Sequence, residues 1–399
     1  MRPIPSLIVA AAAFAAGASH ADAVTDWNTR AGDFIAEAKM GTPPAVRLMA
    51  LVQTAVHEAV GDASARQPDA SARGVAIDAA VAAANRAVLV KALPAQEAAI
   101  TTAYKATVAA LPEGAARATG VDAGEKAGQA VLAARADDGA AGGGEPYRPH
   151  SQAGAYVPTA SPAAPHWAVR RPWLLARPDQ LRPAAPPALA SAAWARDYNE
   201  VKAYGSKSSA VRSADQTDAA RFWEFSLPSI YFGIVRSVAA APARTAAQNA
   251  RLYAAAAQAM DDGLIAVFDA KYHHHFWRPV TAIRNGDKDG NDATEREAGW
   301  TSFSDAPLHP EFPSAHSILA AAVGAVLQAE IGNGPVPVLA TSSPTAKGAV
   351  RRWHRIDDMV QEVANARIWE GIHYRFSTEA GVTMGRRIGE LAVAKFGER

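Results

Sequence analysis

The sequence predicts an all-α protein made of two packed four-helix-type bundles with long irregular loops. Three observations support this fold class. Apolar residues recur at helical spacing over most of the chain, alternating runs of β-branched residues are nearly absent, and the composition is globular, with 49% hydrophobic and 20% charged residues. We expect residues 24–190 and residues 191–399 to pack against each other as one compact domain.

The N-terminal segment, residues 1–23, has the features of a secretory signal peptide. One Arg precedes an apolar run from Leu7 to Ala16, and the small residues Ala21 and Ala23 suit cleavage. The apolar run is too short to cross a bilayer as a helix, and no later stretch is long and apolar enough to do so. We therefore expect a protein without a membrane span that is periplasmic or secreted.

Helical patterns follow from Thr42 to about Asp138. Two of the predicted helices run from Val75 to Leu93 and from Ala95 to Leu111, and each ends at a proline. Residues 138–190 are rich in Gly and Pro but keep several aromatic side chains. We expect this irregular segment to pack across the helices rather than to act as a free linker.

Helices resume in the C-terminal part at about 191–205 and 214–226, and a long helix is predicted from about Thr245 to Arg284. The acidic loop Asp287–Asp292 follows. It resembles a calcium-binding loop only loosely, because its Gly stands at the fourth position and no Glu stands at the twelfth. We interpret it as a solvated turn.

The composition limits the possible partners and chemistry. The 40 Lys and Arg residues are balanced by 39 Asp and Glu residues, so the formal net charge is +1. Nucleic acid is therefore not an expected partner, because phosphate backbones are bound by clustered surplus cations. The chain contains no Cys, which excludes disulfides, zinc–thiolate sites, iron–sulfur clusters and Cys nucleophiles.

Three polar clusters are candidates for chemistry. The first lies in the long predicted helix, where Lys271 and Arg278 are seven residues apart. At about 100° per residue this spacing returns to the same helix face, so the two cations could converge on one oxyanion. The alternative is a pair of cations that extend into solvent from a partly wet helix face.

The second cluster surrounds Ser314. This residue precedes an apolar pattern of helical spacing that stops at Gly332, so it is predicted to begin a helix. The free backbone NH groups at such a position bind anions, and Ser314 adds a hydroxyl. His316, in the first turn, would face the anion; a satisfied polar histidine near a helix terminus is the alternative.

The third cluster contains Arg367 and His373. On an unbroken helix the two residues would lie about 120° apart, but Gly371 predicts that the helix ends and that His373 is presented from a turn. For Arg367, an ordinary ion pair with Glu362 or Glu370 is the alternative.

Together the three clusters supply three fixed positive charges, a helix start, a hydroxyl and two histidines. This donor set suits a tetrahedral or trigonal-bipyramidal oxyanion such as phosphate or vanadate, because charge-assisted hydrogen bonds are strong in a dry pocket. One histidine could bond to the central atom while the other transfers protons.

In this order, the clusters resemble the three signature motifs of the vanadium-dependent haloperoxidase and type 2 phosphatidic acid phosphatase superfamily. The matching residues are Lys271 and Arg278-Pro279, then Pro313-Ser314-Ala315-His316, then Arg367 and His373. Further stretches resemble the bacterial haloperoxidase-like branch, so that the resemblance covers most of the mature chain. These stretches are Met49–Ala63, Arg135–Gly139, Tyr156–Pro187 and Ala220–Trp223.

The resemblance implies an enzyme that binds vanadate and oxidises halides with hydrogen peroxide. His373 would ligate vanadium, His316 would be the catalytic acid and base, and Lys271 would polarise bound peroxide. Phosphate could occupy the same site. The oxyanion would be held by Lys271, Arg278, Ser314, Arg367 and the backbone NH of Ala315.

Three positions depart from the family pattern. Ala315 stands where Gly is usual, and Ala366 stands where a Ser usually precedes the arginine. Ser377 stands where the phosphatase motif has an Asp that orients the last histidine. The missing Asp favours the peroxidase over the phosphatase, unless Glu379 or another carboxylate takes its place.

His309, five residues before Ser314, lies where the haloperoxidases place a residue near the halide. A histidine there resembles the bromide-oxidising enzymes, so we expect bromide to be favoured over chloride. A surface histidine beside Pro310 is the alternative.

Other functions stay open at this point. The runner-up is an acid phosphatase that hydrolyses phosphomonoesters through a phosphohistidine at His373. A third candidate is a catalytically silent protein that only binds the oxyanion. The run His273–His275 could also bind a divalent metal, although adjacent helical positions point in different directions.

Overall fold

A computed structural model describes residues 22–142, 147–242 and 244–397. The predicted signal peptide therefore lies outside the described residues, apart from its last two positions. Asp22 is the N-cap of the first helix, where its side chain accepts a hydrogen bond from the backbone NH of Thr25, and Ala23 is the first helical residue.

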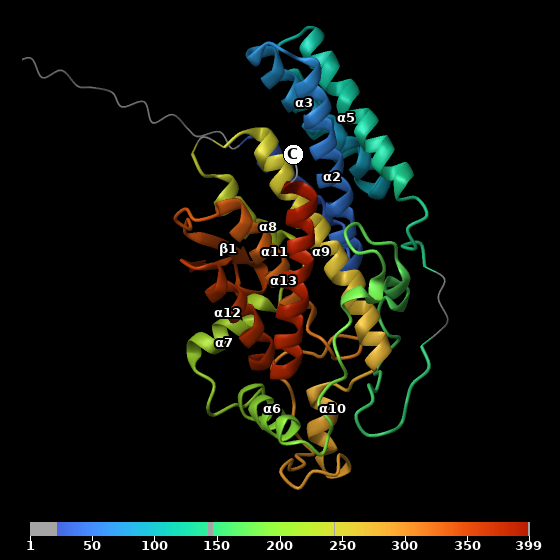
Figure 1. The fold of residues 1–399 in the computed structure, drawn as a ribbon, viewed down its shortest axis with the longest axis vertical. Helices are drawn as coiled ribbons and strands as arrows, with labels where there is room; N and C mark the ends of the chain where they lie inside the picture. Colours follow the sequence, from blue (N-terminus) through green and yellow to red (C-terminus); the bar gives the residue numbers. More distant parts are fainter. Residues whose placement is uncertain (1–21, 143–146, 243, 398–399) are drawn as a thin grey trace, which may run out of the picture.

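The predicted all-α fold is confirmed over the described residues (Figure 1). The N-terminal part contains α1 (Ala23–Glu37), α2 (Thr42–Arg66), α3 (Ala70–Ala92), α4 (Glu97–Ala109) and α5 (Ala115–Ala134). The C-terminal part contains α6 (Ala192–Tyr204), α7 (Ala214–Trp223), α8 (Ser229–Ala239), α9 (Ala246–His274), α10 (Pro279–Arg284), α11 (Ala315–Ile331), α12 (Ile356–Trp369) and α13 (Arg375–Gly397). None of these helices is long and apolar enough to span a membrane.

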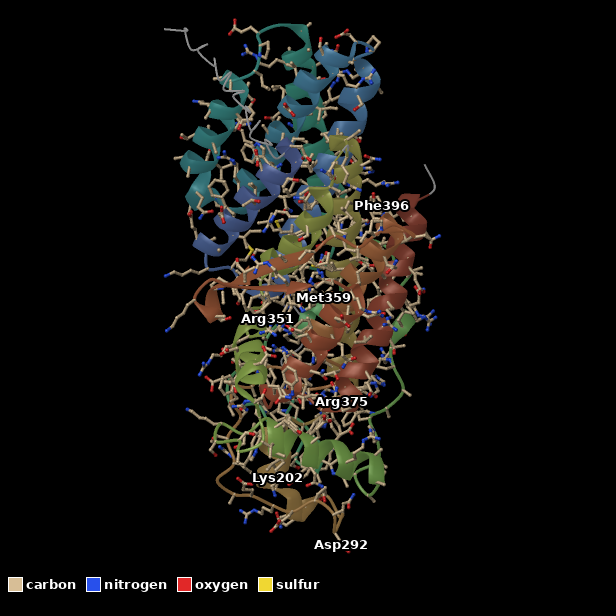
Figure 2. All side chains as sticks on the ribbon, turned by 90° about the vertical axis from the view of Figure 1, so that its left-hand side faces the viewer. Lys202, Asp292, Arg351, Met359, Arg375 and Phe396 are labelled. Atoms are coloured by element: carbon tan, nitrogen blue, oxygen red, sulfur yellow. The ribbon has the colours of Figure 1, made fainter. Side chains whose placement is uncertain are left out.

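Helix α9 connects the two parts, because it packs on α2 on one side and on α11 and α13 on the other (Figure 1). Most of its length is buried on all sides, and the buried residues include the polar side chains Asp261, Asp262 and Lys271 as well as apolar ones. Helices α3 and α5 lie at one end of the molecule (Figure 1). The other end is formed by α6 and the loop after α10, where Lys202 and Asp292 lie (Figure 2).

Small residues allow two helix pairs to approach closely. On α5, a Cβ atom at Gly120 would lie 2.1 Å from the carbonyl oxygen of Ala76 on α3. On α13, a Cβ atom at Gly381 would lie 2.7 Å from the carbonyl oxygen of Ser314, at the start of α11. The second contact matters for function, since it fixes the start of α11 against the first turns of α13.

The irregular segment before α6 packs across α9, as expected. It contains two short 3-10 helices, Pro165–Val169 and Pro178–Leu181, and it buries Trp167. On α9, the Asp262 carboxylate accepts hydrogen bonds from the backbone NH groups of three successive residues, Trp173, Leu174 and Leu175. These bonds hold the segment on the helix.

A second contact between these parts is a group of charges that we call the joint cluster, comprising the buried residues Asp138, Arg170 and Asp261 and the partly exposed Arg47. The Arg170 guanidinium donates to both carboxylates at 2.7 Å, and Arg47 Nε donates to Asp138 at 2.9 Å. The cluster joins α2, the end of α5, the irregular segment and α9.

The prediction of one long helix from Thr245 to Arg284 is wrong. Helix α9 ends at His274, and His275 adopts a left-handed conformation with φ of 50°. Pro279 then begins the short helix α10. A proline cannot continue the hydrogen-bonding pattern of a preceding helix, which explains the break. Lys271 and Arg278 therefore do not share a helix face.

A two-stranded antiparallel hairpin was also not predicted. Strands β1 (Leu339–Ser343) and β2 (Ala349–Trp353) pair with Leu339 opposite Trp353. Each strand has five residues, which is too short for a clear alternation of apolar and polar side chains. The hairpin packs on α8 and leaves the helical architecture unchanged.

Candidate oxyanion site

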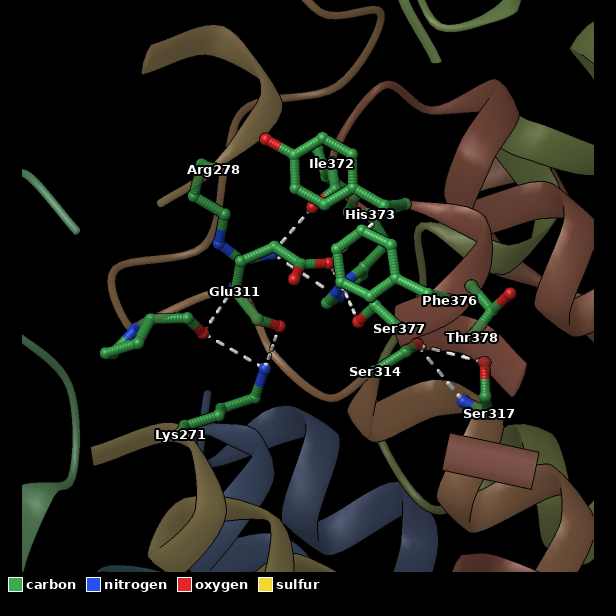
Figure 3. A network of polar contacts seen from close by, with 12 residues as sticks. Lys271, Arg278, Glu311, Ser314, Ser317, Ile372, His373, Phe376, Ser377 and Thr378 are labelled. Carbon is green, nitrogen blue, oxygen red and sulfur yellow. Dashed lines mark hydrogen bonds and ion pairs between the residues drawn. The ribbon is translucent and has the colours of Figure 1, made fainter. Parts of the chain in front are cut away.

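Residues from all three predicted clusters meet at one end of α9, α11 and α12 (Figure 3). Lys271 lies in the last turn of α9, and Arg278 is the N-cap of α10. Ser314 is the N-cap of α11, Arg367 lies in the last turn of α12, and His373 lies in the turn before α13. We call these five residues, with Glu311 and Glu370, the site cluster.

Arg278 connects the first cluster with the two others. Its Nη1 atom donates to the carbonyl oxygen of Ile372 at 2.8 Å and lies 3.3 Å from Nε2 of His373. Its Nη2 atom lies 3.0 Å from Nδ1 of His309. Arg278 is buried, and burial lowers its pKa to about 10, although the nearby Glu311 carboxylate opposes this shift.

Lys271 reaches the segment that precedes α11. Its Nζ atom donates to the carbonyl oxygens of Glu311 at 2.7 Å and Pro310 at 3.0 Å. Burial, and then the charge of Arg278, lowers the pKa of Lys271 well below its ordinary value. A charged ammonium has three donors and two are used here, so one is left for a ligand.

The predicted helix start at Ser314 is confirmed. The Ser314 hydroxyl accepts hydrogen bonds from the backbone NH and the hydroxyl of Ser317, at 3.4 and 3.0 Å. As an acceptor only in these two contacts, it keeps its own hydrogen for donation. The next residue, Ala315, is partly buried and begins the helix, so its backbone NH belongs to the first turn.

His316 has the environment of a proton acceptor. One ring nitrogen bonds the backbone of Phe225, while its buried Nε2 atom has no hydrogen-bond partner among the described residues. Burial, followed by the charge of Arg367, lowers the pKa of His316 well below its ordinary value. The imidazole is therefore neutral near pH 7, with a free nitrogen.

Arg367 is held from one side. Its Nη1 atom donates to the carbonyl oxygen of Trp223 at 2.6 Å and to the carboxylate of Glu370. The alternative ion pair with Glu370 is thus formed, whereas Glu362 pairs with Arg351. The pair does not occupy the whole guanidinium, because the buried Nε atom of Arg367 has no partner in the described part of the chain.

His373 is presented from a turn, as predicted. Gly371, with φ of 77°, follows the end of α12. The Nδ1 atom of His373 lies 2.6 Å from Oε1 of Glu311 and 3.3 Å from the hydroxyl of Ser377. Burial, followed by the charges of Arg278 and Lys271, lowers the pKa of His373 well below its ordinary value.

Glu311 is the site residue that the sequence analysis did not assign. It is fully buried, and burial raises its pKa to about 7. It is 62 positions from His373, so sequence spacing gave no indication of their contact. Glu379, which the sequence analysis considered for this role, is exposed and can be set aside. The only available signal was a carboxylate between two prolines, three residues before Ser314.

His309 also belongs to this site. Besides its contact with Arg278, its ring packs edge-on against Phe268, with 5.3 Å between ring centroids. The side chain is half-buried, and burial lowers its pKa well below the ordinary value. His309 therefore lies at the edge of the site, partly exposed and in contact with Arg278.

The site cluster fits an oxyanion. It buries three cations, Lys271, Arg278 and Arg367, against two carboxylates. Buried donors without a partner are costly, and an anion would satisfy them. Arg367 Nε is such a donor, and the unpartnered His316 Nε2 could exchange a proton with the same ligand. Vanadate and phosphate both match this combination of cations, hydroxyl and histidines.

The run His273–His275 does not form a metal site. Its side chains line a surface cavity together with His150. Within residues 22–142, 147–242 and 244–397, no group of three or more His, Asp or Glu side chains is arranged to hold a metal ion.

The fold is that of the vanadium-dependent haloperoxidases. A bacterial vanadium-dependent iodoperoxidase superposes with a TM-score of 0.76 at 21% identity, covering 94% of this chain and 96% of that one. The apo form of a bacterial vanadium-dependent chloroperoxidase gives a TM-score of 0.72 at 17% identity, covering 88% and 92%. The holo form gives 0.70 at 17% identity, covering 90% and 92%.

The C-terminal sequence can be assigned more specifically. Residues 251–398 match the family model described as the VCPO second helical-bundle domain. This range includes all three motif clusters. The sequence similarity to this domain therefore covers the part of the chain that carries the motifs, and the solved structures add a similarity in fold. No curated protein gives a significant sequence match.

Proposed function

We propose that this protein is a vanadate-dependent haloperoxidase, which converts hydrogen peroxide, a halide ion and a proton into a hypohalous acid and water. The observation that carries the proposal is the site cluster, in which three buried cations and the buried ring of His373 lie near the helix start at Ser314. The similarity to haloperoxidases in fold and in the C-terminal sequence supports it.

In this function, vanadate is the cofactor and His373 supplies its protein ligand through Nε2. Arg278, Arg367, Lys271, the Ser314 hydroxyl and the backbone NH of Ala315 would hold the oxygens. Bound vanadate supplies a Lewis-acid centre that activates hydrogen peroxide without changing its own oxidation state.

The side chains around this position have separate tasks. Neutral His316 takes a proton from hydrogen peroxide through its free Nε2 atom and returns it to the peroxide oxygen that leaves as water. Lys271, with one uncommitted donor, stabilises negative charge on that oxygen. Because all three cations are buried, water does not screen their charges, which strengthens each contact with the oxyanion.

We further propose that bromide is favoured over chloride through His309. The histidine lies beside Arg278, where it can meet a halide approaching the oxyanion. Replacing His309 with Ala should lower the bromide rate relative to the chloride rate by roughly threefold to tenfold, as expected for one polar contact. Steady-state bromination and chlorination by the variant would measure this ratio, and an unchanged ratio would remove His309 from halide selection.

A phosphatase is the second candidate, and one observation favours it. The Glu311 carboxylate bonds His373, so the site has the orienting carboxylate whose absence at position 377 argued against a phosphohistidine. The missing Asp therefore no longer distinguishes the two activities.

The N-terminal sequence also supports an exported enzyme, and we propose that it acts in the periplasm or outside the cell.

Two parallel assays on purified protein, with and without orthovanadate, test the proposal. One measures peroxide-dependent bromination of a dione dye, and the other measures hydrolysis of a chromogenic phosphomonoester. Bromination that requires vanadate and is inhibited by phosphate is the expected result. Hydrolysis without vanadate, inhibited when vanadate is added, would make the protein a phosphatase. Saturable vanadate binding with neither activity would indicate a silent oxyanion-binding protein.

A further inference from the structure

We propose that Glu311 is a positioning residue, which holds His373 in the tautomer with the proton on Nδ1 and the lone pair on Nε2. This inference deepens the proposed function and rests on it for its catalytic meaning. The tautomer itself can be tested separately, because it is a property of the protein without a ligand.

The two ring nitrogens of His373 face opposite kinds of partner (Figure 3). Nε2 lies 3.3 Å from Nη1 of Arg278, and a guanidinium can only donate. Nε2 therefore accepts in this contact, which at 3.3 Å is longer than the contact at Nδ1. Nδ1 in turn lies 2.6 Å from Oε1 of Glu311, and a carboxylate accepts this proton in a hydrogen bond. Both contacts specify the same tautomer.

Glu311 is itself fixed at several points. Its backbone NH donates to the carbonyl oxygen of Phe276 at 2.8 Å, and its own carbonyl oxygen accepts from Lys271 Nζ at 2.7 Å. The backbone NH of Tyr374 approaches Oε1 at 3.3 Å. Glu311 therefore contacts the residue that would ligate vanadium through its carboxylate, and the residue that would polarise peroxide through its backbone carbonyl oxygen.

A carboxylate that is hydrogen-bonded to the non-ligating nitrogen of an imidazole has two effects. It fixes the orientation of the ring, and it increases the electron density on the distal nitrogen, so Nε2 becomes a stronger ligand or nucleophile. Removing such a partner commonly weakens binding by about 10-fold to 100-fold. The same range is expected for vanadate binding after replacement of Glu311 with Ala.

Ser377 provides a second way to test the role. Its hydroxyl lies 3.3 Å from Nδ1 of His373, so an Asp at this position would bring a carboxylate to the same nitrogen. The double variant Glu311→Gln/Ser377→Asp moves the negative charge from position 311 to position 377, beside the same nitrogen. Glu379→Gln is the matched control, since Glu379 lies two residues from Ser377 but is exposed.

The experiment uses the mature protein labelled with [15N]histidine and without vanadate. Nitrogen NMR distinguishes protonated from unprotonated ring nitrogens, and the His373 signals are those missing from His373→Ala. Calorimetry with orthovanadate then gives the affinity of each variant. We expect a protonated Nδ1 in the wild type, a mixture of tautomers and an affinity about 10-fold to 100-fold lower in Glu311→Ala, and recovery of both properties in the double variant.

Several results would overturn the proposal. These are a protonated Nε2 in the wild type, wild-type tautomer and affinity in Glu311→Ala, or an equal loss in Glu379→Gln. If Glu311→Ala does not fold, the double variant decides: a protonated Nδ1 supports the role, and a tautomer mixture contradicts it. If the wild type shows the expected tautomer but binds no vanadate, the proposed function fails while the positioning role of Glu311 stands.

Discussion

The protein buries charge in two places, and the two clusters differ in how their carboxylates are used. In the joint cluster, both oxygens of Asp138 and both oxygens of Asp261 accept hydrogen bonds. The donors are Arg170, Arg47, the backbone NH of Ala140 and the indole NH of Trp173. In the site cluster, Oε2 of Glu311 and Oε2 of Glu370 have no partner within the described residues.

The cations of the two clusters also differ in the acceptors to which they donate hydrogen bonds. Arg170 donates to carboxylates, whereas Lys271 and Arg278 donate mainly to backbone carbonyl oxygens and histidine nitrogens. A carboxylate neutralises a buried cation, but a carbonyl oxygen only positions it. In the joint cluster the carboxylates thus neutralise Arg170, although its Nε atom has no partner within the described residues, whereas the site cluster retains positive charge for a ligand. Burial of charge alone would not have distinguished them.

The largest effect on stability is expected from Arg170→Ala. The change leaves Asp138 and Asp261 buried without their shared cation, and breaking a buried pair of this kind costs about 3–5 kcal/mol of unfolding free energy. Urea unfolding followed by circular dichroism measures this loss, while vanadate affinity of the folded protein should stay unchanged. Arg177→Ala, which removes an exposed ion pair with Asp179, is the control and should cost less than about 1 kcal/mol. Equal losses in the two variants would contradict the structural role of the joint cluster.

His373→Ala should instead change vanadate binding and leave the stability of the fold unchanged. Removal of the proposed vanadium ligand is expected to lower vanadate affinity by at least about 100-fold, while the fold survives. His316→Ala is the informative partner, because it should keep vanadate binding and lose most turnover. Calorimetry and peroxide-dependent bromination separate the two results. Unchanged vanadate affinity in His373→Ala would refute the ligand assignment.

Acid should weaken the joint cluster. Burial alone would raise the pKa of Asp138, but hydrogen bonds from Arg47 and Arg170 outweigh burial and hold the pKa at about 2, below the ordinary value of 3.8. The resulting stabilisation is present above the ordinary value and is lost as the pH falls towards 2. It amounts to about 2 kcal/mol. Unfolding free energies between about pH 5 and pH 2 should fall less in Asp138→Asn than in the wild type; parallel curves would show that this carboxylate contributes nothing.

The smallest effect is expected from Glu370. Because its carboxylate and the Trp223 carbonyl hold Arg367 from one side, Glu370→Ala should let the guanidinium move and weaken vanadate binding by roughly tenfold. Glu370→Gln keeps an acceptor for Arg367 and should retain more of the affinity than the Ala variant. If Gln and Ala behave alike, or if neither changes the affinity, Glu370 does not position Arg367.

Features that depend on local sequence were predicted well. The start of α11 at Ser314 and the end of α12 before Gly371 follow from capping residues, and both were located to within a residue or two. The motif residues are also near one another in the structure. The single long helix was wrong because helical periodicity outweighed Pro279 in the prediction, although a proline there should have marked a break.

Features that depend on long-range contacts were not predicted. Glu311 belongs to the site only because the fold brings it to His373, 62 positions away, and no spacing rule identifies this pair. The joint cluster likewise combines residues from four separate elements. The sequence thus indicated the cations of the motifs and the local partner Glu370, but not the distant carboxylate of Glu311.

The most direct test of the central claim is a crystal structure of the protein with orthovanadate. We expect one vanadium atom bonded to Nε2 of His373, with its oxygens contacting Lys271, Arg278 and Arg367, and with Glu311 still bonded to Nδ1. Vanadium bound elsewhere, or a site in which Arg278 remains on Nε2 at saturating vanadate, would contradict the proposal that this cluster is an oxyanion site.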